Sequence, residues 1–238
     1  MGITIDFKFI GTVFIAILKA LPVTLEITGV SILVGLIIGI LTASVRIFKV
    51  KGLKQLAEFY VSFTRGTPML MQLLIVYYAI PQIYDYYAVI YGWTFKSYEI
   101  PILVFALIAF SINTGAYMSE VIRSGIMAVE KGQFEACYSV GMTIRQTMTR
   151  VVLPQALGIS IPMITSMLIS LLKGTSIAFT ISILEVTGMA KATAATNYNF
   201  LEAYLACAIL YWGLSMLVER VSEFLEKRVM IYSKGGFA

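Results

Sequence analysis

The sequence predicts an all-α membrane protein with about five transmembrane helices in a single domain, residues 1–238. Apolar residues make up 59 % of the 238 positions and charged residues 13 %, the inverse of the balance with which a water-soluble domain covers its surface. A bilayer core about 30 Å thick takes roughly 20 apolar residues of helix to cross. The charge-free windows that meet this need are residues 27–45, 66–84, 100–119, 151–172 and 203–218. They are continuously apolar, unlike the alternating strands of a β-barrel.

The first window follows a short apolar stretch, residues 9–18, which Lys19 and Pro22 interrupt. We expect this stretch to form a separate amphipathic lead-in on the outer surface. The window itself is long and follows a polar leader, so it is predicted to be a retained helix and not a cleaved signal. Gly35 and Gly39 lie four residues apart, which lets another helix approach closely, either within the chain or across a dimer.

Two ionisable residues precede the second window. Glu58 and Arg65 lie seven residues apart on one helical face, and charge at membrane depth is costly unless it is paired or reaches water. We predict a structural ion pair that anchors an early start of the second span, with Pro68 kinking the helix. The window leads into aromatic residues typical of a membrane interface: Tyr77, Tyr78, Tyr84, Tyr86, Tyr87, Tyr91 and Trp93.

The third window has an unusually polar inner half. Asn113, Tyr117 and Glu120 recur at spacings of four and three, so they share a helical face that must meet the bundle interior or a wet cavity. Ser166 and Ser170 share a face of the fourth window. These five residues are candidates for lining a substrate path. Helix packing is the alternative for Asn113 and for the two serines.

The region after the fourth window is a connector. Residues 174–184 are apolar but too short to span the bilayer. Lys173, directly before them, either snorkels to the outer interface, as a structural residue, or faces an anionic ligand.

The basic residues are distributed unevenly along the chain. With the N-terminus outside, the inner loops hold twelve Lys and Arg residues and the outer segments five, which fits the positive-inside rule and places the C-terminus in the cytoplasm. Anionic lipid beside these loops explains the net charge of +5 without nucleic acid. The inner residues are Arg46, Lys49, Lys51, Lys54, Arg123, Lys131, Arg145, Arg150, Arg220, Lys227, Arg228 and Lys234.

Several kinds of chemistry are missing from the sequence. There is no histidine, and Cys137 and Cys207 have neither disulfide nor metal-ligand spacing. No Gly-x-x-x-x-Gly-Lys-Ser/Thr motif is present to cradle a phosphate. We therefore expect no metal, no cofactor and no enzyme activity in this chain.

The longest polar stretch lies between the third and fourth windows, at about residues 130–150, and the charge count makes it cytoplasmic. A helix-competent run ends at Gly141, which can form a left-handed cap. Pro154 then opens the next span near its first turn, where a missing N–H costs little. The stretch reads Lys131-Gly-Gln-Phe-Glu-Ala-Cys-Tyr-Ser-Val-Gly-Met-Thr, and Val151-Val-Leu-Pro follows Gly141 after nine intervening residues.

This spacing resembles the EAA loop of ABC import permeases. Two further stretches, with Asn113-Thr-Gly-Ala-Tyr between them, resemble the polar amino-acid subfamily, and the resemblance covers about residues 20–225. They read Phe63-Thr-Arg-Gly-Thr-Pro-Met-Leu-Met-Gln-Leu and Ser166-Met-Leu-Ile-Ser-Leu-Leu-Lys-Gly-Thr-Ser. The chain departs from the family pattern at Cys137, Val151 and Gly174, where Ala, Ile and Asp are usual.

The resemblance implies a multi-pass permease of the bacterial inner membrane for amino acids. Its loop would be a coupling helix that docks on a separate ATPase and moves as one rigid body with the spans, with Glu135, Ala136, Gly141, Met142 and Thr143 at the contact. The implied partners are a second permease subunit, identical or paralogous, an ABC ATPase dimer that binds the ATP, and an extracellular solute-binding protein.

A zwitterionic amino acid needs donors for its carboxylate and acceptors for its ammonium, which the candidate path residues can supply. Glu120 has a second interpretation, as a gate residue paired with Arg123. The alternative function is an ion-coupled secondary carrier with carboxylate relays, although no inverted repeat is evident. An intramembrane enzyme has neither His nor paired carboxylates within the spans to work with.

Overall fold

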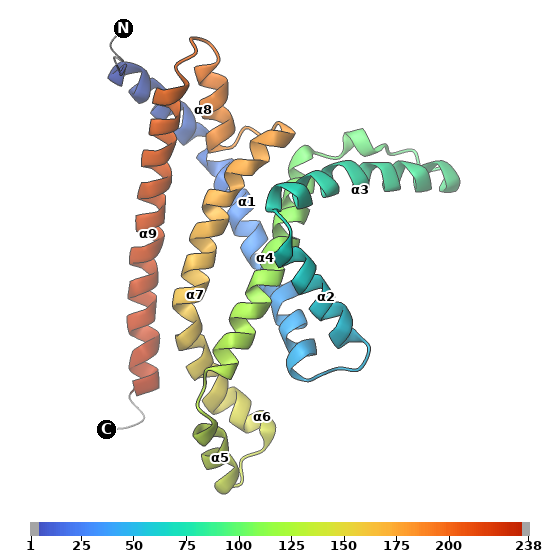
Figure 1. Ribbon diagram of the computed structural model, residues 1–238, viewed down its shortest axis with the longest axis vertical. Helices are drawn as coiled ribbons and strands as arrows, with labels where there is room; N and C mark the ends of the chain where they lie inside the picture. Colours follow the sequence, from blue (N-terminus) through green and yellow to red (C-terminus); the bar gives the residue numbers. More distant parts are fainter. Residues whose placement is uncertain (1–4, 235–238) are drawn as a thin grey trace.

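The computed structural model describes residues 5–234, with side chains through Arg228, so the Lys234 side chain and the two ends of the predicted domain lie outside the described part. The described chain is helical and contains no strand. Figure 1 shows long helices side by side, with α3 projecting sideways from them. The helices are α1 (Phe7–Ile47), α2 (Leu53–Gly66), α3 (Met69–Tyr91), α4 (Ile102–Met127), α5 (Lys131–Ser139), α6 (Ile144–Thr147), α7 (Leu153–Gly174), α8 (Val186–Ala194) and α9 (Phe200–Lys234), with shorter 3-10 turns η1 (Ser97–Glu99) and η3 (Thr175–Ile181).

Five helical segments of the described chain are long and apolar enough to cross a membrane. They are α1, α3, α4, the continuous run Ile144–Ile181 that contains α6 and α7, and Phe200–Arg228 within α9. Each contains or overlaps one predicted window, which confirms the all-α class with about five spans. The short run after the fourth window, residues 174–184, contains η3 and precedes α8. Most of it continues the fourth apolar segment, which extends to Ile181, so the run is not a separate span.

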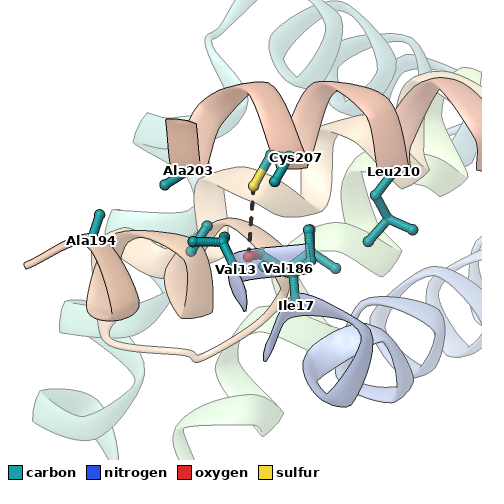
Figure 2. Packing of buried hydrophobic residues seen from close by; sticks show 9 residues of the cluster. Val13, Ile17, Val186, Ala194, Ala203, Cys207 and Leu210 are labelled. Atoms are coloured by element: carbon teal, nitrogen blue, oxygen red, sulfur yellow. Dashed lines mark hydrogen bonds between the residues drawn. The ribbon is translucent and has the colours of Figure 1, made fainter. Parts of the chain in front are cut away.

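The prediction for the N-terminal lead-in is wrong. Phe7–Ile47 is one continuous helix of 41 residues with Pro22 inside it. Its N-terminal half packs one face into the bundle, because Val13 and Ile17 are fully buried against α8 and α9 (Figure 2). The Val186 N–H also donates to the Thr24 hydroxyl at 3.2 Å. These tertiary contacts keep the helix continuous across residues that favour a break in an isolated chain.

The packing of α1 on α4 depends on two glycines of α1. A Cβ on Gly35 would lie 2.6 Å from the Thr114 methyl carbon, and one on Gly39 would lie 2.7 Å from the Met118 side chain. Both distances are far below a normal carbon contact, so any larger residue would push the two helices apart. The pair therefore serves packing within the chain, which was one of the two interpretations.

The second span differs from its prediction in two ways. Thr67 and Pro68 are extended and separate α2 from α3 completely, so Pro68 begins a new helix instead of kinking one. Proline disfavours a helical conformation of the residue before it, which explains the break. The predicted Glu58–Arg65 pair does not form: Glu58 lies 3.5 Å from the Lys54 amine, and Arg65 turns toward Glu120 instead.

The fourth span begins earlier than expected. Helical structure starts at Ile144 and passes through a π turn, Met148–Val152, before α7. Pro154 lies in the first turn of α7, as predicted, and has no N–H to donate. The π turn precedes it, with the Leu153 N–H donating to the Met148 carbonyl five residues back, so the chain stays helical around the proline.

Candidate functional site

The loop that carries the EAA-like sequence is a helix-turn-helix beyond one end of the bundle (Figure 1). Helix α5 ends at Ser139 and Gly141 has φ +78°, so the predicted left-handed cap is confirmed. The Met142 N–H donates to the Cys137 carbonyl at 3.0 Å, which completes the cap. Thr143 then begins α6 with a capping box: its hydroxyl accepts from the Gln146 N–H at 3.3 Å.

One face of this loop is free and the other is fixed to the bundle. Glu135 and Ala136 are exposed, whereas Cys137 is 5 % exposed. Phe134 packs on a small core formed by Val129, Val152 and Ala156 at the foot of α7. The Gln155 amide also donates to the Gln133 side chain at 3.2 Å. The loop and α7 are therefore connected by side chains as well as by the backbone.

All five predicted path residues line two adjoining cavities between α4 and α7. The first, which we name the central cavity, has a volume of about 490 Å³ and is lined by Asn113, Tyr117, Ser166 and Ser170 among others. The second, the inner cavity, also has about 490 Å³ and is lined by Tyr117, Glu120 and Ser166. Because Tyr117 and Ser166 line both, the two cavities adjoin each other along α4 and α7.

The central cavity is lined mainly by apolar and uncharged side chains. Asn113 donates to the Gln72 side-chain oxygen at 3.0 Å. Gln72 is buried and donates in turn to the carbonyls of Thr64 and Thr67, at 2.7 and 3.1 Å. The orphan carbonyls at the end of α2 are thereby satisfied. Gln72 thus positions Asn113, a role that the sequence analysis missed although Gln72 lies within the quoted subfamily stretch.

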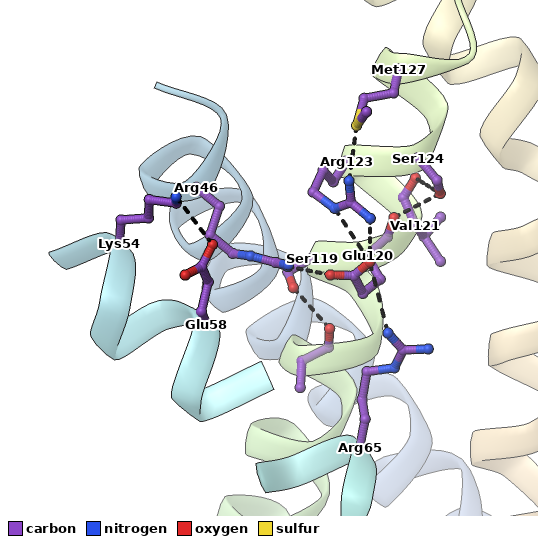
Figure 3. Close-up of polar contacts among 11 residues, drawn as sticks. Arg46, Lys54, Glu58, Arg65, Ser119, Glu120, Val121, Arg123, Ser124 and Met127 are labelled. Atoms are coloured by element: carbon purple, nitrogen blue, oxygen red, sulfur yellow. Dashed lines mark hydrogen bonds and ion pairs between the residues drawn. The ribbon is translucent and has the colours of Figure 1, made fainter. Parts of the chain in front are cut away.

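A cluster of charges lies at the inner cavity (Figure 3). Glu120 accepts hydrogen bonds from Arg46 and from Arg123, the latter at 2.9 Å, and Arg65 Nη1 lies 3.8 Å from its second oxygen. The predicted pairing of Glu120 with Arg123 is present. Arg46 was not recognised as a site residue, because it belongs to an inner loop in sequence and reaches Glu120 only through the close packing of α1 on α4.

Lys173 lies apart from this path. It lines a third cavity, between α7 and α9, together with Tyr211, Ser215 and Glu219. Ser166, Ser170 and Gly174 face the central cavity instead, so Lys173 is on a different face of α7. Snorkelling of its amine stays a prediction.

A buried carboxylate that sequence reasoning missed lies in the connector. Glu185 is fully buried and begins α8, where it accepts from the N–H groups of Thr187 and Gly188 at 2.9 and 2.8 Å. It also accepts from the Tyr211 hydroxyl at 2.9 Å, which ties α8 to α9. Burial raises the pKa of Glu185 above its ordinary value despite these hydrogen bonds. The available signal was an acidic N-cap between two apolar runs.

The helical bundle, the two adjoining cavities and the attached loop define a multi-pass membrane protein. Residues 35–231 match the family described as "Binding-protein-dependent transport system inner membrane component", and the chain belongs to this family. It is therefore a multi-pass protein of the inner membrane. Membership implies a substrate-binding protein and an ATPase as partners. Permease subunits of such systems lack an ATP-binding site of their own.

Relatives and a solved structure match almost the whole chain. It is 36 % identical to the probable amino-acid ABC transporter permease protein PatM of Vibrio harveyi, over 94 % of this chain and 96 % of that protein. It is 35 % identical to the L-cystine transport system permease protein TcyL of Bacillus subtilis (strain 168), over 94 % of this chain and 91 % of that protein. The crystal structure of an amino acid ABC transporter with histidines shares 29 % identity and a TM-score of 0.81, covering 95 % of this chain and 100 % of that chain.

Proposed function

We propose that this chain forms the translocation pathway of an ATP-driven importer for amino acids. The observation that carries the proposal is the pair of cavities between α4 and α7, which is connected through α7 to an exposed helical loop. Relatives over nearly the full length are named as amino-acid and L-cystine permeases, which supports the substrate class.

Helix α5 and the turn after it are the coupling helix in this proposal. Glu135, Ala136, Gly141, Met142 and Thr143 contact the ATPase on the cytoplasmic side. The exposure of Glu135 and Ala136 and the packing of Phe134 on the foot of α7 support this role. Movement of the ATPase then passes to α7, because the loop and the helix are joined by a packed core and not by a flexible linker.

The orientation follows from the same proposal. The coupling helix and the C-terminus face the cytoplasm and the N-terminus faces outside, as the distribution of basic residues predicts. The inner cavity is then the cytoplasmic end of the path. Two permease subunits, identical or paralogous, two ATPase subunits and an extracellular solute-binding protein make up the complete transporter.

The path residues have separate roles in transport. Asn113, Tyr117, Ser166 and Ser170 line the central cavity, where their polar groups replace part of the water around a solute. Glu120 fixes the arginines at the inner end. Its two hydrogen-bonded arginines make it a structural gate residue in this proposal, in addition to being a lining residue.

The test measures coupling in the intact transporter. Glu135→Gln keeps the shape of the residue and removes its charge, so we expect ATP hydrolysis to lose its stimulation by substrate and uptake to fall at least tenfold, with normal amounts of protein in the membrane. Glu58→Gln removes an exposed carboxylate on α2 whose one ion pair within the described residues is with Lys54, and we expect it to transport normally. Unchanged uptake with Glu135→Gln, or uptake that an uncoupler abolishes while ATP is present, would contradict the proposal.

A further inference from the structure

Three arginines surround Glu120, but only Arg65 among them lines the inner cavity. Arg46 and Arg123 both donate hydrogen bonds to the Glu120 carboxylate. Arg65 remains 3.8 Å from it, is 46 % exposed, and makes no hydrogen bond within the described part of the chain. A guanidinium has five N–H donors in a planar fork. Arg65 therefore lines the cavity with donors that no hydrogen bond among the described residues uses; Figure 3 shows its guanidinium beside Glu120.

The side chain of Arg65 is held in place without using those donors. Its guanidinium carbon lies 5.6 Å from the centre of the Tyr117 ring, a cation–π distance. The single carboxylate of Glu120 is shared among three guanidinium groups, so the cluster keeps an excess of positive charge. An anionic group entering the inner cavity meets both charge and a fork that matches a carboxylate.

Hydrogen-bond acceptors face the central cavity, whereas Arg65 offers donors to the inner cavity. The hydroxyls of Ser166 and Ser170 donate to backbone carbonyls four residues back, at 3.0 and 2.8 Å, which leaves their lone pairs for the cavity. The Asn113 amide donates to Gln72 at 3.0 Å, and its own side-chain oxygen has no donor among the described residues. These oxygens are acceptors suited to an ammonium group.

The rest of the central cavity has no charge. Its described lining contains no acidic and no basic side chain, and Met69, Met163 and Met167 contribute flexible apolar surface. A charged side chain of a solute would lose its hydration there without gaining a counter-ion. An uncharged side chain of varied shape would lose little hydration free energy on entering the cavity.

We propose that this path selects amino acids with uncharged side chains and excludes cationic ones. Arg65 binds the α-carboxylate at the boundary of the two cavities. Ser166 and Asn113 accept from the α-ammonium, and the side chain lies among the methionines of the central cavity. This inference rests on the proposed function, because it assigns the substrate class of the same path.

The test uses two ligands that differ in charge alone. Citrulline and arginine have the same length and the same α-amino acid group, but the ureido end of citrulline is neutral. Binding of each radiolabelled ligand is measured on the permease–ATPase complex in lipid nanodiscs, without the solute-binding protein, whose own selectivity would mask the path. Glutamine against lysine and ornithine extends the comparison. We expect citrulline to bind at least tenfold more tightly than arginine.

Variants at Met167 and Arg65 test the two charge interactions proposed, and a variant at Lys54 is the control. Met167→Glu places a carboxylate in the central cavity and should raise arginine affinity at least tenfold, whereas the isosteric Met167→Gln should not. Arg65→Gln should weaken citrulline binding at least tenfold. Lys54→Gln, at the opposite end of α2 from Arg65 and outside the lining of both cavities, should leave citrulline binding unchanged.

Failure of this inference is distinguishable from failure of the proposed function. If arginine binds the wild-type complex as tightly as citrulline, if Arg65→Gln binds normally, or if no neutral amino acid binds, the selection proposed for this path is wrong. Substrate-stimulated ATP hydrolysis and amino-acid uptake by the complete transporter would still support the proposed function. Loss of those activities in the wild-type transporter would overturn both.

Discussion

At the scale of single residues, Gly141 determines where α5, the proposed coupling helix, ends. Its φ of +78° lies in the left-handed region, and a residue with a Cβ is disfavoured there by about 1–2 kcal/mol. We predict that Gly141→Val shifts the end of α5, lowers uptake several-fold and leaves ATP hydrolysis active but uncoupled. Gly132→Ala is the control, because Gly132 is helical and has no atom near its missing Cβ. Parallel assays of uptake and hydrolysis check both variants, and normal coupling in Gly141→Val would contradict the role of the cap.

Glu185 predicts a dependence of stability on pH. Burial raises its pKa in the folded chain above the ordinary value of 4.5. The folded protein then holds the proton at a pH where the unfolded chain has lost it, so the free energy of unfolding falls as pH rises above 4.5. We predict that Glu185→Gln lacks this component. The unfolding temperature of the variant relative to wild type, measured in detergent, should rise between pH 4.5 and the raised pKa and then level off. A difference that is constant with pH would show that the carboxyl is not perturbed.

Residue pairing shows what the sequence could and could not predict. The face shared by Asn113, Tyr117 and Glu120 was predictable because helical periodicity fixes which side chains point together. The ion-pair partner of Arg65 was not predictable. Periodicity within one helix favoured Glu58, but the structure pairs Arg65 with Glu120, 55 positions along the chain. Such a contact depends on how α2 packs against α4, which no local pattern determines.

At the scale of elements, the joint between α1 and α4 gives a matched pair of substitutions. Gly39→Ala would place a Cβ 2.7 Å from Met118 and 3.1 Å from the Ser119 backbone nitrogen, while Gly29→Ala on the same helix meets nothing within 4 Å. Overpacking typically costs about 1–3 kcal/mol. Ala for Gly in an open helix position gains about 0.5–1 kcal/mol.

We therefore predict that Gly39→Ala unfolds at a lower temperature than wild type and that Gly29→Ala unfolds at the same or a higher temperature. Thermal unfolding of the purified proteins in detergent measures the unfolding temperatures of both variants and of wild type. Equal unfolding temperatures for the two variants would mean that α1 and α4 can separate at no cost, contrary to the packing described.

The continuity of α1 illustrates why element boundaries were harder to predict than element identity. Proline inside a helix removes one hydrogen bond and usually ends or bends the helix, so a break at Pro22 was the reasonable expectation. The helix continues because Val13 and Ile17 on one side and Thr24 on the other are held by α8 and α9. Those partners lie more than 160 positions away in sequence. The break before Pro68 was visible in principle, since Thr67 precedes a proline at the end of an amphipathic segment.

At the scale of the whole molecule, the proposed path between α4 and α7 must open to one side of the membrane at a time. The number of spans was predictable from apolar length, and the helical loop between the third and fourth spans from its polar sequence. The position of the two adjoining cavities was not predictable, because it depends on how α4 and α7 pack against each other. Both cysteines of the chain are buried, which makes a single introduced thiol a usable probe of this opening.

We predict that Ser166→Cys, in a background with Cys137 and Cys207 replaced by alanine, reacts with a membrane-impermeant thiol reagent added from the cytoplasmic side. Ser166 lines both cavities, so its reactivity reports the opening of the inner end. Leu33→Cys, at an exposed apolar position of α1, is the control and should not react from either side. Trapping the complex with ATP and the solute-binding protein should lower the cytoplasmic reactivity of Ser166→Cys at least fivefold and raise the reactivity from outside. Equal labelling from both sides in both states would mean that the cavities form an open channel and not an alternating path, and an importer driven by ATP could not maintain a gradient through it.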